Sequence, residues 1–95
     1  MTTFEYYEII DEKSFAEKLT GLKPIHERIL EIHEAITWRL GKNQEGTAIP
    51  GFPDYRVYKT VPIGDIPSFW VLFKVDNPGE KVHLISLEPV EEKEE

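Results

Sequence analysis

The sequence predicts an α+β domain in which a helix hairpin packs on one face of a largely antiparallel four-stranded sheet, in the order β-α-α-β-β-β. Two patterns carry this prediction. Residues 68–76 are rich in aromatic and β-branched side chains and end at a Pro-Gly turn, which is typical of a central strand. Apolar residues also recur three or four positions apart, as on one face of a helix: Ile25, Ile29, Ile32, Ile36 and Leu40.

The first elements are a strand and a short helix. Residues 4–10 contain aromatic and β-branched side chains and predict the first strand. Asp11 is a candidate N-cap for the helix that follows, and Ser14 is a second candidate. Gly21 helps to end this helix.

The longer helix is predicted from about residue 24 to residue 40, with Gly41 as its C-cap. Because the connection between the two helices is short, they should lie antiparallel. Residues 42–53 carry several glycines and prolines and predict a loop.

The second half of the chain predicts three strands in sequence. Residues 55–60 form the second strand and residues 68–76 the third, and a type II turn at residues 76–80 leads into the last. That last strand covers residues 81–88 and is ended by Pro89.

The predicted turn sets a register in which Val75 pairs with Lys81 and Phe73 with His83. The face toward the helices then carries Phe69, Val71, Phe73, Ile85 and Leu87, and His83 also points to that side. The other face carries Trp70, Leu72, Lys74, Val82, Leu84 and Ser86. Because a single helix hairpin covers one face only, we expect a partner-binding surface made of Trp70, Leu72, Val82 and Leu84.

Composition narrows the functional classes. The chain contains no cysteine, which excludes a disulfide framework and a cysteine nucleophile. Its net charge of −7 argues against a general nucleic-acid binder. We expect one domain over residues 1–90, an acidic disordered tail over residues 91–95, no signal peptide, no membrane span and a cytoplasmic location.

Three short segments of the sequence carry a family resemblance: residues 29–36, 55–57 and 71–76. Together with the order of elements, they resemble the RelE/ParE superfamily of bacterial toxins, which includes plasmid stabilisation proteins. The resemblance covers residues 4–90. It implies the toxin of a type II toxin–antitoxin module, bound by an antitoxin protein. Such toxins act either as ribosome-dependent mRNA interferases or as poisons of DNA gyrase.

The resemblance also implies candidate catalytic residues for metal-independent RNA cleavage, which needs a base, an acid and cations for the phosphate. Arg56 and Lys59 match basic positions of the second strand, and His83 is a candidate general base. The chain departs from the family pattern at Phe69 and Trp70, where active relatives often place arginine. The end of the last strand also lacks the expected histidine, arginine or tyrosine, which weighs against ribonuclease activity.

No cofactor is expected. His26 and His33 lie seven positions apart on the predicted helix, too wide for the i, i+4 spacing of a helical metal pair. The alternative to a toxin is a catalytically silent interaction module of the same fold, which forms a homodimer or binds another protein through the uncovered sheet face.

Overall fold

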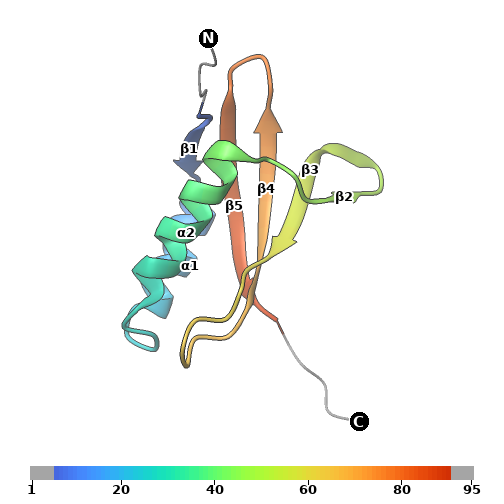
Figure 1. The fold of residues 1–95 in the computed structure, drawn as a ribbon. Coiled ribbons are helices and arrows are strands. Elements are labelled where there is room, and N and C mark those ends of the chain that lie inside the picture. Colours follow the sequence, from blue (N-terminus) through green and yellow to red (C-terminus); the bar gives the residue numbers. More distant parts are fainter. Residues whose placement is uncertain (1–5, 91–95) are drawn as a thin grey trace.

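The computed structural model describes residues 6–90, in which two helices pack on a five-stranded sheet (Figure 1). The elements are β1 (Glu8–Asp11), α1 (Lys13–Leu22), α2 (Ile29–Lys42), β2 (Thr47–Ile49), β3 (Phe52–Lys59), β4 (Phe69–Asp76) and β5 (Lys81–Pro89). The sheet order is β1-β5-β4-β3-β2, with β1 parallel to β5 and the other neighbours antiparallel. The predicted α+β class is therefore confirmed. The predicted acidic tail and the first residues of the predicted first strand lie outside the described residues.

The fifth strand is β2, which lies inside the segment predicted as a loop. Thr47 pairs with Val57 and Ala48 with Arg56 before a shift in register brings Ile49 opposite Phe52. Gly51, with φ +84°, makes the tight reversal between the two strands. A three-residue strand next to Pro and Gly gives too weak a pattern to be recognised from sequence alone.

The apolar stripe of α2 packs into the core as predicted, except at its first member. Ile29, Ile32, Ile36 and Leu40 are buried, and Phe15 and Leu19 join them from α1. Ile25 is 69% exposed, because α1 ends in turns at Leu22 and α2 begins only at Ile29. The amides of Ile25 and His26 both donate to the Leu22 carbonyl, which closes these turns. The predicted start of the long helix was therefore about five residues too early.

Gly41 is not the C-cap of α2, because the helix continues to Lys42 and Asn43 is the cap. Gly41 is buried, and its carbonyl accepts a hydrogen bond from the Tyr7 amide at 2.9 Å. A β-carbon at this position would lie 3.5 Å from the Tyr7 carbonyl oxygen, which is an ordinary van der Waals contact, so the close approach of the chain before β1 does not require glycine here.

β4 alternates between the two faces of the sheet. Phe69, Val71, Phe73 and Val75 are buried beneath the helices, and the residues between them are more exposed. This central position and this orientation agree with the sequence pattern.

The register between β4 and β5 differs from the prediction by one residue. Asp76, not Val75, pairs with Lys81, because the connecting turn contains only residues 77–80. The residue in the left-handed conformation is Glu80, with φ 52°, so Gly79 does not play the role that a type II turn would give it. A slip of one residue exchanges the two faces of a strand.

Val82 and Leu84 are consequently fully buried under the helices, and their predicted place on the partner-binding face was wrong. His83 points away from the core for the same reason. A register shift between Leu72 and Phe73 leaves Ile85 without a direct partner in β4 and returns Leu87 to the core. No helix in residues 6–90 is long and apolar enough to cross a membrane.

Candidate functional site on the outer face of the sheet

The face of the sheet opposite the helices, here called the outer face, is the candidate functional surface. Strand alternation and the registers of β3, β4 and β5 place on it Tyr55, Val57, Lys59, Trp70, Leu72, Lys74, His83 and Ser86. Neither helix covers this face, so its side chains are half-buried by one another or exposed. Trp70 is 43% exposed.

One half of the outer face is apolar. Its residues, called the apolar patch, are Ile49, Phe52, Tyr55, Trp70 and Leu72. Four of them, all but Trp70, line a pocket of about 310 Å³. The rings of Phe52 and Tyr55 meet edge to face with 6.1 Å between centroids, and Phe52 is 58% exposed. Contiguous exposed aromatic and aliphatic side chains of this kind mark protein-binding surfaces.

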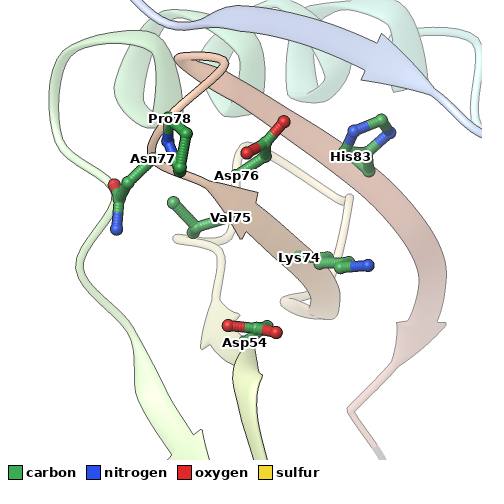
Figure 2. A pocket seen from close by; sticks show the side chains of 7 residues that line it. All are labelled: Asp54, Lys74, Val75, Asp76, Asn77, Pro78 and His83. Atoms are coloured by element: carbon green, nitrogen blue, oxygen red, sulfur yellow. The ribbon is translucent and has the colours of Figure 1, made fainter.

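The other half is polar and contains a second pocket, of about 350 Å³ (Figure 2). Its lining comes from β3, from β4 with the following turn, and from β5: Asp54, Lys74, Val75, Asp76, Asn77, Pro78 and His83. Lys74 and His83 are direct partners in the β4–β5 register. A cationic side chain therefore stands beside an imidazole in the lining of this pocket.

The imidazole of His83 is oriented by a carboxylate. Its Nδ1 lies 2.7 Å from Oε2 of Glu12. The parallel pairing of β1 with β5 places Glu12 there, and the Glu12 amide donates to the Leu84 carbonyl at 3.0 Å. Because a carboxylate can only accept, Nδ1 carries the proton and Nε2 of the neutral ring remains able to act as a base.

The chemistry of this polar half is limited by its cations. The arginines of the chain all lie elsewhere: Arg28 pairs with Glu31, Arg39 stacks on Tyr58, and Arg56 donates to the Gln44 carbonyl. Lys74 is the cation of this pocket, and Asp54 and Asp76 line it as well. One base beside one lysine can move a proton, but it gives little stabilisation to a pentavalent phosphate.

The structure separates the three catalytic residues predicted from sequence. Arg56 pairs with Phe73 in the register and thus lies on the helix side of β3, away from the outer face. Lys59 is exposed at the end of β3 opposite Trp70. Trp70 lies four positions along β4 from Lys74, the neighbour of His83, which corresponds to roughly 13 Å at about 3.3 Å per residue.

Sequence reasoning missed Glu12 and Lys74 as members of the site. Lys74 was placed on the uncovered face, but its pairing with His83 depends on the register that was off by one. Glu12 follows a four-residue strand whose parallel partner lies some seventy positions later in the chain, and no local pattern signals that pairing.

The other two histidines take part in separate contacts. His33 Nε2 lies 3.0 Å from the Asp11 carboxylate, and the His26 ring meets Phe69 edge-on at 6.2 Å. Within the described part of the chain, no group of three or more histidine, aspartate or glutamate side chains has the arrangement of a metal site.

We expect Arg56→Ala to destabilise the protein. Arg56 Nη1 donates to the Gln44 carbonyl at 2.7 Å and so fastens the segment between α2 and β2 to β3. Losing a hydrogen bond with a charged donor lowers the free energy of unfolding by about 1.5–3 kcal/mol, as measured by urea denaturation. The control is Lys59→Ala, which should change this free energy by about 0.5 kcal/mol or less. Equal stability of the two variants would contradict the anchoring role.

The chain matches no protein-family model and no curated protein sequence. Among solved structures, it is similar to a chain of the toxin–antitoxin complex RelBE2 from Mycobacterium tuberculosis, with a TM-score of 0.72 and 10% sequence identity. The alignment covers 95% of this chain and 98% of that chain. At this identity the similarity concerns the fold alone, and it extends over nearly the whole length of both chains. The chain therefore shares the fold of that chain of the RelBE2 complex.

Proposed function

We propose that the chain is the toxin-like component of a type II toxin–antitoxin module and that it binds its antitoxin through the apolar patch. The observation that carries this proposal is the similarity to a chain of the RelBE2 complex over nearly the whole length of both chains. The patch supplies a suitable surface, because it joins exposed aromatic rings to a half-buried leucine at the centre of the sheet.

We further propose that the protein acts by binding a protein target, for which DNA gyrase is the class that the family resemblance implies. A ribosome-dependent mRNA interferase must bind a polyanion, and the outer face carries no arginine while acids line its polar pocket. The net charge of −7 adds an unfavourable long-range term for RNA.

RNA cleavage on the ribosome is the second candidate function, and the contact between His83 and Glu12 is the observation that favours it. An imidazole oriented by a carboxylate beside Lys74 has the geometry of a general base next to a cation. In this case His83 would take the proton of the 2′-hydroxyl, and Lys74 would contact the phosphate.

Growth of a bacterial host tests these proposals. We expect induction of the chain alone to arrest growth, and co-expression of the protein encoded by the adjacent reading frame to relieve the arrest. His83→Ala should still arrest growth if the protein acts by binding, and should lose toxicity if it cleaves RNA.

Circular dichroism of His83→Ala provides the folding control for that comparison. Harmless expression of the wild-type chain at a detectable level, together with no binding of the neighbouring protein, would contradict the toxin proposal. An interaction module of the same fold would then be the remaining interpretation.

A further inference from the structure

A third pocket, on the helix side of the molecule and apart from the outer face, has the features of an anion site. It has a volume of about 290 Å³ and lies between α2, the end of β3 and the segment after β3. Its lining residues are Ile32, Ala35, Arg39, Tyr58, Lys59, Thr60, Val61 and Ile63. Two of these are cationic and none is acidic, in a protein whose net charge is −7.

Within residues 6–90, no carboxylate forms an ion pair with Arg39. Its guanidinium carbon lies 4.2 Å from the centroid of the Tyr58 ring, so stacking on the ring holds it in place. Among residues 6–90, Arg39 Nη1 is buried and has no hydrogen-bond acceptor. Buried donors are nearly always paired in folded proteins, and a charged donor without an acceptor is especially unfavourable. An acceptor bound in this pocket would lower that energy.

Tyr58 adds a neutral donor to the same wall. Burial raises the pKa of its phenol above the ordinary value, and the nearby charge of Arg39 opposes this rise only in part. The phenol therefore keeps its proton at neutral pH and does not act as the counter-ion of Arg39. A phenol O–H in this position can donate to an anion.

The remaining lining selects the kind of anion. Ile32, Ala35, Val61 and Ile63 are aliphatic, so most of the wall would contact an apolar group. A planar guanidinium pairs well with a planar carboxylate. The negative charge of the whole protein disfavours a dianion such as phosphate more than a monoanion.

We propose that this pocket binds a monovalent carboxylate that carries a short branched aliphatic group, with Arg39 contacting the carboxylate. The proposal goes beyond the toxin function and does not depend on it, because none of the residues of the apolar patch lines this pocket. The same chemistry occurs in a free branched-chain acid and in an acidic residue next to an aliphatic one in a peptide.

Titration of the ¹⁵N-labelled protein with sodium isovalerate, followed by NMR at constant ionic strength, tests the proposal. We expect resonances of Arg39, Tyr58 and Ile63 to shift with a dissociation constant on the order of 1 mM, as befits so small a ligand. The neutral 3-methylbutan-1-ol and inorganic phosphate should each bind about tenfold more weakly. Equal binding of either compound, or no binding of isovalerate, would overturn the proposal.

Variants distinguish binding in the pocket from non-specific attraction of anions to the protein surface. Arg39→Gln should weaken isovalerate binding about tenfold or more, and Tyr58→Phe, which removes the phenol donor from the wall, about threefold. The matched control is Arg28→Gln, which removes the same charge from an exposed residue paired with Glu31 and should leave binding unchanged. If Arg39→Gln does not fold, Tyr58→Phe still decides, since unchanged binding in that variant would contradict the site.

A second titration identifies the source of the carboxylate. If N-acetyl-Val-Asp-amide binds about tenfold more tightly than isovalerate, the natural ligand is a peptide. If it binds equally or more weakly, the pocket takes the free acid.

Discussion

Phe73→Ala is expected to lower the free energy of unfolding by about 3–5 kcal/mol, because it opens a cavity at the centre of the core. Phe73 is fully buried, and its ring meets Tyr58 at 6.3 Å between centroids. Since small domains are stable by only about 5–15 kcal/mol, this loss removes much of the total. Urea denaturation followed by circular dichroism measures it. If the variant does not fold, Phe73→Leu should fold and lose about 1.5 kcal/mol or less.

Trp70→Ala is the matched control from the other face of the same strand. Trp70 is the larger side chain, but it is 43% exposed on the outer face, so we expect it to contribute about 1 kcal/mol or less. Similar losses in Phe73→Ala and Trp70→Ala would contradict the assignment of the two faces of β4.

Alternation along β4 groups Phe69, Val71 and Phe73 on one face and Trp70 and Leu72 on the other, and the structure confirms this grouping. The predicted face assignment of β5 was wrong for a local reason. Its face depends on whether the turn before it contains an even or an odd number of residues between paired positions. The observed turn relies on Glu80 in a left-handed conformation, which non-glycine residues rarely adopt.

The candidate site was less predictable than the fold, because its members come from separate strands. Alternation along β4 is enough to place Trp70 and Leu72 on the same face. The contact between Glu12 and His83 needs both the register of β5 and its parallel pairing with β1. Arg56 shows a further limit, since its basic side chain points to the helix side and satisfies a backbone carbonyl instead of facing a ligand. Residue type alone does not tell which side of β3 it occupies.

Leu72→Ala and Leu84→Ala are expected to separate partner binding from stability, although both remove the same atoms. Leu84 is fully buried, so Leu84→Ala should lower the free energy of unfolding by about 2–5 kcal/mol. Leu72 is half-buried in the apolar patch, so its loss should lower that free energy by about 1 kcal/mol. The Leu72→Ala variant should bind the protein of the adjacent reading frame more weakly by about 2–4 kcal/mol, which is a roughly 30- to 700-fold loss of affinity.

Isothermal titration calorimetry of each folded variant measures the affinity, and urea denaturation measures the stability. If Leu84→Ala is largely unfolded, Leu84→Met keeps most of the side-chain volume and should bind the partner like the wild type. Because Leu84 lies beneath the helices and Leu72 lies on the outer face, weaker binding in Leu84→Met than in Leu72→Ala would place the antitoxin on the helix side of the sheet. That result would remove the apolar patch from the proposed function while leaving the fold intact.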